Sequence, residues 1–294
     1  MTATDSTSDV THSIPAEAAL RRESPLAARS GRGRFGTAVA RFGPPLAVLA
    51  GILIVWYIAA LVLEADGKGF LLPTPNEVIA AGLFDPEVRG DIWESLLRTT
   101  GVALTGLAIA IVIGVTWAVS MALASWIERS TFAYAVILQT IPILALVPLI
   151  GFWFGFEFTA RVIVCVLIAL FPMVSNTLFG LQSVEKSQHE LFKLQKASKW
   201  IVLSKLMMPA ALPAIFVGIR TSAGLAVIGA IVGDYFFRRG DPGIGSLISN
   251  YTSRLQGAEL FAAILAACLL GVVIFAAFGW LAKAAVGRWY EPAS

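Results

Sequence analysis

Side chains that catalyse covalent or acid–base reactions are sparse in this sequence. Its two histidines, His12 and His189, lie far apart, and neither joins a set of Asp, Ser or His residues at catalytic spacing. The two cysteines, Cys165 and Cys268, have no CxxC partner and no neighbouring histidine, which argues against a disulfide or a metal site. A Gly-rich loop ending in Lys-Ser or Lys-Thr is also absent. The sequence therefore predicts no catalytic residue, no metal and no bound cofactor.

Lysines gather instead in one stretch, residues 190–213, which reads ELFKLQKASKWIVLSKLMMPAALP. Apolar residues recur there mostly at three- and four-residue spacing, which is the pattern of an amphipathic helix. Such a charged segment does not lie in hydrocarbon. It is either an interfacial helix held by anionic lipid or a docking element for another protein. The apolar face comprises Leu191, Leu194, Ala197, Ile201 and Val202, with Lys193, Lys196 and Lys199 toward the other side.

The rest of the chain is built from long apolar runs. The sequence is 57% hydrophobic and only 14% charged, and its mean hydropathy is +0.78, whereas soluble domains carry about 25% charged residues. A run of about 20 apolar residues spans a bilayer as a helix. The fold class predicted is therefore an all-α membrane protein with six transmembrane helices. They are expected at Pro44–Leu63, Thr99–Ala124, Phe132–Phe152, Val162–Leu181, Ala214–Val232 and Leu260–Ala282.

The segments outside these runs define the expected domains and the orientation. Residues 1–43 are rich in Ser, Thr, Ala and Arg and are predicted to be a disordered cytoplasmic tail. Residues 44–285 form the membrane domain, and residues 286–294 form a second cytoplasmic tail. With the N-terminus inside, Lys and Arg residues favour the inner side two to one, which predicts both termini in the cytoplasm. The net charge of +3 therefore indicates topology rather than nucleic-acid binding.

The first polar segment between spans, residues 64–98, contains the sequence Leu72-Pro-Thr-Pro75. Its Pro-x-Pro pattern, followed by Asn76 as a helix cap, predicts a short surface helix. Deeper in the chain, Asp234 is expected to pair with Arg238 or Arg239 near the end of the fifth span. Arg220, inside that span, is expected to extend toward the lipid headgroups rather than to meet a substrate.

Several motifs together resemble the permease subunits of binding-protein-dependent ABC importers, whose cytoplasmic loop has the form E-A-A-x-x-x-G followed by a segment ending in L-P. Glu190 matches the leading Glu, Ala197-Ser198 match an Ala-Ser that often follows the Gly, and Met208-Pro209 match the L-P. The resemblance covers residues 44–285 and implies a type I importer permease with a coupling helix in a cytoplasmic loop, residues 185–212. Flanking motifs that fit are Gln139 to Pro142, Pro148 to Gly155, Phe171-Pro172, Gly229 to Tyr235 and Gly243-Ile-Gly245.

The basic stretch departs from the family pattern at two places. Leu191-Phe192 replace Ala-Ala, and Lys196 replaces the Gly. A Lys at positive φ costs about 1 kcal/mol or more, so we expect either a nearly continuous helix through Lys196 or a wider contact with the partner. Phe192 is either an anchor in the partner's groove or a residue packed against its own bundle.

The resemblance assigns roles to two sets of residues. Prolines in the third and fourth spans remove backbone hydrogen bonds and kink the helices, and the polar residues beside them either line a translocation pathway or bond helix to helix. The pathway set is Gln139, Thr140, Pro142, Ser175, Asn176, Thr177, Ser222 and Asp234. The ATPase-coupling set is Glu190, Leu191, Phe192, Lys193, Lys196, Ala197, Ser198, Lys199, Met208 and Pro209.

The resemblance also implies partners and a location. These are a cytoplasmic ABC ATPase dimer that uses ATP and Mg, an extracytoplasmic solute-binding protein, membrane lipid and a second permease chain, identical or not. The location is the bacterial cytoplasmic membrane, which the chain crosses several times. A secondary carrier would usually show intramembrane acidic residues or repeated halves, and a scaffold would not need kinked polar spans.

Within the family, the match favours the branch that imports nitrate, sulfonates, taurine, thiamine precursors and riboflavin. The runs ELFKL and GAIVGDY lean toward a vitamin-precursor heterocycle, such as a thiamine pyrimidine precursor or riboflavin. The alternative substrate class is a sulfonate, taurine or nitrate.

Overall fold

The computed structural model describes residues 34–237 and 239–287, and that part of the chain contains helices and no strand. The chain divides into two compact units, Met1–Ile52 and Leu53–Ser294, and the boundary between them falls within helix α1 (Arg34–Ala65). The expected N-terminal tail lies outside the described residues up to residue 33. From Arg34 to residue 43 the chain is already helical, so α1 begins ahead of the predicted span. Of the expected C-terminal tail, residues 288–294 lie outside the described part.

Five described helices are long and apolar enough to cross a membrane, and the count is six if a bent pair is one span. The pair is α4 (Ser125–Thr140) and α5 (Ile143–Phe154), bent by 99°. This pair corresponds to the third predicted span. The unbroken spans are α1, α3 (Pro86–Leu123), α6 (Phe158–Gln182), the run from α8 (Lys199–Val202) into α9 (Met208–Phe236), and α11 (Gly257–Val286).

The bend between α4 and α5 follows from Pro142. A residue before a proline is driven out of the helical region by the proline ring, and Ile141 is extended at φ −66° and ψ 127°. Pro142 also lacks a backbone N–H and therefore cannot continue the hydrogen bonds of α4, and it becomes the N-cap of α5. Its carbonyl then accepts a hydrogen bond from the Ala145 N–H at 2.8 Å at the start of α5.

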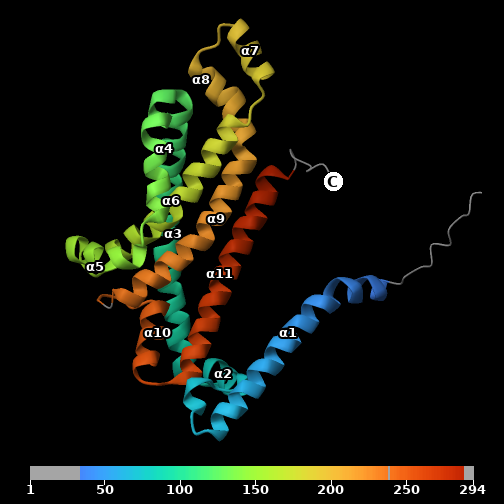
Figure 1. Cartoon of the computed structure of the whole chain (residues 1–294), viewed down its shortest axis with the longest axis vertical. Helices are drawn as coiled ribbons and strands as arrows, with labels where there is room; N and C mark the ends of the chain where they lie inside the picture. Colours follow the sequence, from blue (N-terminus) through green and yellow to red (C-terminus); the bar gives the residue numbers. More distant parts are fainter. Residues whose placement is uncertain (1–33, 238, 288–294) are drawn as a thin grey trace, which may run out of the picture. The chain divides into compact units, whose positions relative to one another are not determined.

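Helices α3, α6 and α9 run side by side through the bundle (Figure 1). Small residues bring them close together. Cys165 of α6 is fully buried between Gly106 of α3 and Gly229 of α9, and a Cβ at Gly229 would lie 2.8 Å from the Cys165 Cα. Cys165 is therefore a packing residue, as free buried cysteines usually are.

A pair of short helices, α2 (Pro75–Ile79) and α10 (Ile244–Ser253), lies at one end of the bundle. The first of them has a different cap from the one predicted. Thr74 accepts a hydrogen bond from the Glu77 N–H, and the Glu77 carboxylate accepts one from the Thr74 N–H at 2.8 Å. Thr74 rather than Asn76 is the cap, because Pro75 fills the first helical position and needs no donor. Short 3₁₀ and π turns flank α2 at Gly69–Leu71 and Ala80–Phe84.

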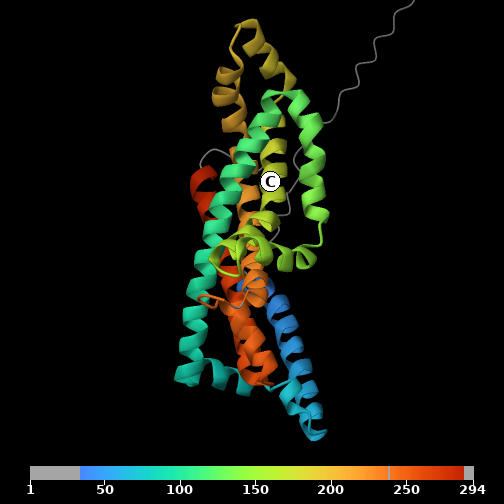
Figure 2. The same cartoon turned by 90° about the vertical axis from the view of Figure 1, so that its left-hand side faces the viewer.

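The predicted coupling loop lies at the opposite end from α2 and α10 (Figures 1 and 2). It contains α7 (Lys186–Leu194), α8 and a π turn, Leu203–Met207, that leads into α9. Helix α11 ends on the same side of the bundle as α7 and α8 (Figure 1).

Candidate coupling site and buried polar residues

Helices α7 and α8 form a helix–turn–helix, and the turn between them lies at Lys196. The Lys196 φ is +52°, in the left-handed region. The Ala197 N–H donates to the Phe192 carbonyl at 3.0 Å, and the Lys196 N–H donates to the Lys193 carbonyl at 3.0 Å. These two hydrogen bonds define a Schellman motif, in which Lys196 takes the position that usually belongs to glycine.

The expectation of a nearly continuous helix through Lys196 is therefore wrong. The Schellman hydrogen bonds satisfy carbonyls that the end of α7 would leave without partners. This gain stabilises the left-handed conformation, which costs a residue with a Cβ about 1 kcal/mol. Lys196 thus keeps the bend at the position where the family pattern has Gly. A wider contact with the partner stays a prediction.

Helix α8 starts directly after the turn and is attached to the bundle. The Ser198 hydroxyl accepts a hydrogen bond from the Ile201 N–H at 3.4 Å, which makes Ser198 the helix cap. The Lys199 ammonium donates to the Leu123 carbonyl at 3.2 Å, at the last residue of α3. A cation at the C-terminal end of a helix is electrostatically favourable. Lys199 therefore connects the turn to the end of a membrane span.

Large apolar side chains of the helix–turn–helix remain exposed. Leu191 is 54% exposed, Leu194 82% and Trp200 68%. Phe192, predicted as a possible anchor, is half-buried instead. We call Leu191, Leu194 and Trp200 the exposed apolar surface. Sequence reasoning did not assign Leu194 or Trp200 to the coupling set, although each is adjacent to one of its lysines, Lys193 and Lys199. Exposed apolar side chains that gather on a surface indicate an interaction site.

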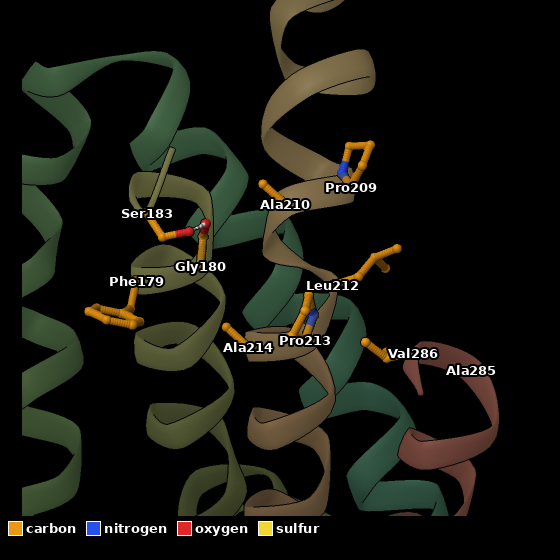
Figure 3. A pocket seen from close by; sticks show the side chains of 10 residues that line it. All are labelled: Phe179, Gly180, Ser183, Pro209, Ala210, Leu212, Pro213, Ala214, Ala285 and Val286. Atoms are coloured by element: carbon orange, nitrogen blue, oxygen red, sulfur yellow. Dashed lines mark hydrogen bonds between the residues drawn. The ribbon is translucent and has the colours of Figure 1, made fainter. Parts of the chain in front are cut away.

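The remaining coupling residues lie on either side of this surface. Glu190 and Lys193 are exposed on α7, and Met208 and Pro209 open α9. Pro209 lines a cavity of about 760 Å³ between α6, α9 and α11, together with Phe179 and Val286 (Figure 3). The Ser183 hydroxyl in this cavity already donates to the Gly180 carbonyl at 2.7 Å. The cavity is therefore mostly apolar.

The polar residues predicted for the pathway lie on three helices, α4, α6 and α9, and differ in exposure. Gln139 and Thr140 are exposed at the end of α4, next to Pro142 at the bend, and the Thr140 hydroxyl donates to the Ile137 carbonyl at 2.8 Å. Ser222 of α9 is buried and donates to the Ala169 carbonyl of α6 at 2.8 Å. Ser222 therefore forms a helix-to-helix hydrogen bond.

In α6, the polar residues after Pro172 bond to their own helix. The Asn176 amide donates to the Pro172 carbonyl at 2.8 Å, and the Ser175 hydroxyl donates to the same carbonyl at 3.4 Å. Both side chains are half-buried, whereas Thr177 is fully buried. Pro172 lies inside α6 and cannot donate a backbone hydrogen bond, and these side-chain contacts add hydrogen bonds to the helix beside it.

Asp234 is fully buried, and its ion-pair partner is Arg161 of α6 rather than Arg239. The Arg161 Nε lies 3.4 Å from the Asp234 Oδ1, and the Arg161 side chain is only 3% exposed. The Thr99 hydroxyl of α3 donates to the Asp234 Oδ2 at 2.5 Å and accepts from the Ile244 N–H at 2.9 Å. The other expected partner, Arg238, lies outside the described residues.

Arg161 also fixes the chain that connects α9 to α10. Its guanidinium donates to the Phe237, Arg239 and Asp241 carbonyls at 2.8, 2.7 and 2.6 Å. A Cβ at Gly243 would collide with the Asp234 carboxylate, so the Gly-Ile-Gly sequence lets this chain pass directly over the ion pair. Sequence reasoning placed Arg161 in an outer loop. The sequence signal that could have indicated its role is Asp234, near the end of a span, followed by the Gly-x-Gly sequence Gly243-Ile-Gly245.

Arg220 stacks on a neighbouring helix within the membrane-spanning region. Its guanidinium lies 4.1 Å from the Phe275 ring centroid of α11, and a Cβ at Gly279 would lie 3.0 Å from the Arg220 Nε. Phe275 precedes the end of α11 at Val286 by about 16 Å of helix. The guanidinium therefore rests on an aromatic face, an arrangement that is favourable for a cation, and does not extend past the end of α11.

Residues 106–289 match the family model described as binding-protein-dependent transport system inner membrane component. This match includes the bent span, the buried ion pair and the helix–turn–helix. The chain belongs to this family. It is therefore the permease subunit of an ABC importer and a multi-pass protein of the cytoplasmic membrane.

Curated relatives extend the similarity along most of the permease. The chain is 32% identical to the formylaminopyrimidine transport permease protein of Halalkalibacterium halodurans over 77% of its length and 88% of that protein. It is 30% identical to the riboflavin transport system permease protein of Chloroflexus aurantiacus, covering 83% and 89% of the two chains. It is also 30% identical to a putative aliphatic sulfonates transport permease protein of Escherichia coli, covering 75% and 82%.

Proposed function

We propose that this permease is driven by a cytoplasmic ABC ATPase dimer that docks on the helix–turn–helix. The observation that carries the proposal is the turn at Lys196. It presents Leu191, Leu194 and Trp200 as exposed apolar side chains on a segment that is covalently continuous with α9. Buried apolar side chains supply most of the free energy of a protein interface. A movement of the ATPase would be transmitted through the π turn directly into α9.

The orientation that this requires is N-terminus and C-terminus inside. The distribution of Lys and Arg favours it, because the coupling segment and the N-terminal residues are basic. The opposite end, with α2, α10 and the chain held by Arg161, then faces a solute-binding protein. ATP and Mg are used by the ATPase, since this sequence has no phosphate-binding Gly-rich loop.

Docking is tested by co-purification with the ATPase. Replacement of Leu194→Ala together with Trp200→Ala removes two large side chains from the exposed apolar surface, and we expect loss of the ATPase. The matched control, Ser187→Ala with Gln188→Ala, alters exposed residues of α7 and should keep the ATPase bound. A melting curve of each permease alone separates loss of docking from loss of folding. Retention of the ATPase by the folded Leu194→Ala/Trp200→Ala variant would show that docking uses another surface.

We propose a small organic solute as the cargo, with a vitamin-precursor heterocycle as the first candidate. Support comes from similarity to the formylaminopyrimidine and riboflavin permeases, at 32% and 30% identity. The pathway would be completed by a second permease chain, identical or not, as the resemblance to importer permeases implies. Similarity to the sulfonate permease favours an aliphatic sulfonate as the second candidate.

The cargo is tested on the cognate solute-binding protein, which recognises the solute before the permease does. A pyrimidine thiamine precursor, riboflavin, an aliphatic sulfonate, taurine and nitrate are added separately, and the melting temperature is measured. Ligand binding stabilises the folded protein according to its affinity and concentration. We expect stabilisation by a heterocycle, whereas stabilisation by the sulfonate alone would establish the second candidate. Competition in an uptake assay with the assembled transporter then links the ligand to transport.

A further inference from the structure

A cavity of about 720 Å³ lies beneath the helix–turn–helix, between α7–α8 and the adjoining ends of α3 and α6. Its floor is apolar and includes Leu181, Val202 and Met207. Leu181 is fully buried in the bundle, and Met207 is 8% exposed. The floor is therefore a fixed part of the hydrophobic core rather than a mobile surface. The exposed apolar surface of Leu191, Leu194 and Trp200 does not line this cavity.

The rim of the same cavity is basic. Lys186, His189, Lys193 and Lys199 all line it. Within the described residues, none of the four forms an ion pair with a carboxylate. Lys199 donates to the Leu123 carbonyl, and Glu128 reaches the lining only through a hydrogen bond from the Gln182 amide at 2.8 Å. Like charges around one cavity repel each other, so an anion placed there would be stabilised.

The position of the cavity decides which kind of anion fits. Leu123 and Gln182 are at the ends of the membrane-spanning helices α3 and α6, so the cavity opens at the level where the hydrocarbon meets the headgroups. A basic rim above an apolar floor complements a molecule with a negative head and an apolar tail. A small soluble anion would leave the floor unfilled.

We propose that this cavity binds one anionic phospholipid of the adjoining leaflet. The phosphate lies among Lys186, His189 and Lys193, and the start of an acyl chain covers Leu181 and Met207. The lipid connects α7 to the ends of α3 and α6, so it positions the coupling segment against the bundle. The proposal depends on the membrane location of the chain and not on its direction or on ATPase docking.

The first experiment compares three compounds on the purified full-length permease in detergent. Phosphatidylglycerol, phosphatidylcholine and soluble glycerol phosphate are titrated separately, and the melting temperature is followed. We expect a saturable rise with phosphatidylglycerol alone, and loss of the rise at 1 M salt because screening weakens contacts between charges. An equal rise with phosphatidylcholine would overturn the requirement for an anion. An equal rise with glycerol phosphate would overturn the assignment to a lipid.

The second experiment locates the site. Lys186→Gln with Lys193→Gln should weaken the apparent affinity for phosphatidylglycerol at least about tenfold, since each lysine near an anionic lipid contributes about 1 kcal/mol. Lys205→Gln with Lys283→Gln removes the same charge from residues outside the cavity and should leave the affinity unchanged. Lys186→Arg with Lys193→Arg should retain it. Equal weakening of the affinity by both Gln double variants would overturn the assignment of the lipid to this cavity. If the Lys186→Gln/Lys193→Gln variant does not fold, the comparison of the three compounds on the wild-type permease decides the proposal.

Discussion

At the scale of single residues, Lys196 shows how a hydrogen-bond pattern holds an unfavourable backbone conformation. Its φ of +52° is typical of glycine, and two backbone hydrogen bonds close the end of α7 around it. A side chain with a Cβ is tolerated in the left-handed region at a cost of about 1 kcal/mol. The bend is therefore a property of the segment as a whole, and the side chain at this position sets only its stability.

Replacing Lys196→Gly should therefore raise the free energy of unfolding by about 1 kcal/mol without moving the turn. Lys205→Gly, at a right-handed helical position, should instead lower it by about 1 kcal/mol. Denaturant unfolding of the purified permease measures both. A loss of stability in Lys196→Gly would contradict a left-handed conformation at this residue.

Asp234 is the residue on which three helices and the chain into α10 depend. Asp234→Asn keeps the shape but leaves the buried Arg161 without its carboxylate, and removing one partner of a buried pair costs about 3 kcal/mol or more. The control is Asp241→Asn, because the Asp241 side chain is 87% exposed and lies 4.0 Å from Arg98. We expect a large drop in melting temperature for Asp234→Asn and almost none for Asp241→Asn. Equal drops would indicate that burial of the pair is unimportant.

At the scale of helices, close contact between α6 and α9 depends on small side chains. In a membrane, lipid tails are as apolar as the helices, so association depends on packing and interhelical hydrogen bonds rather than on hydrophobic burial. Gly229 against Cys165 provides close packing, and Ser222 to Ala169 provides a hydrogen bond. A change in either therefore affects the contact between the two spans directly.

Gly229→Ala should destabilise the bundle by about 1–3 kcal/mol, because the new Cβ would lie 2.8 Å from the Cys165 backbone, which cannot move aside alone. Gly224→Ala in the same helix meets only the Phe275 ring edge at 3.6 Å and should be neutral or slightly stabilising. Thermal unfolding in detergent distinguishes the two variants. Similar melting temperatures for both would mean that α6 and α9 do not pack at this distance.

At the scale of the whole molecule, the two ends of the bundle differ in chemistry. One end carries the basic helix–turn–helix, and the other carries α10 and the chain fixed by Arg161. An importer needs such a difference, because energy is supplied on one side of the membrane and the solute on the other. The basic end favours the cytoplasm.

The orientation is tested with single cysteines after Cys165→Ala and Cys268→Ala. Ser187→Cys on α7 and Ser253→Cys on α10 are both exposed positions at opposite ends of the bundle. A membrane-impermeant maleimide added outside intact cells should label Ser253→Cys directly and Ser187→Cys only after permeabilisation. The reverse labelling would place the coupling segment outside and exclude ATPase docking there.

Sequence reasoning predicted the features that depend on local composition. Five of the predicted spans are long apolar helices, recognisable because partition of a helix into a bilayer depends on its own residues. Pro142 marked the bend in the third predicted span because its ring constrains Ile141. Membership of the importer permeases was predicted from motifs such as Glu190 and Met208-Pro209 of the basic stretch, and the family match confirms it.

Only the tertiary structure decided the features that join distant residues. Arg161 and Asp234 belong to different spans, so no local pattern identified them as partners, and the same holds for Lys199 at the end of α3. The bend at Lys196 also escaped sequence reasoning, because the cost of one residue is a local quantity whereas the hydrogen bonds that offset it form only when the segment folds. Hydropathy determines which segments enter the membrane, and contacts between those segments determine which charges are paired and which remain free to bind.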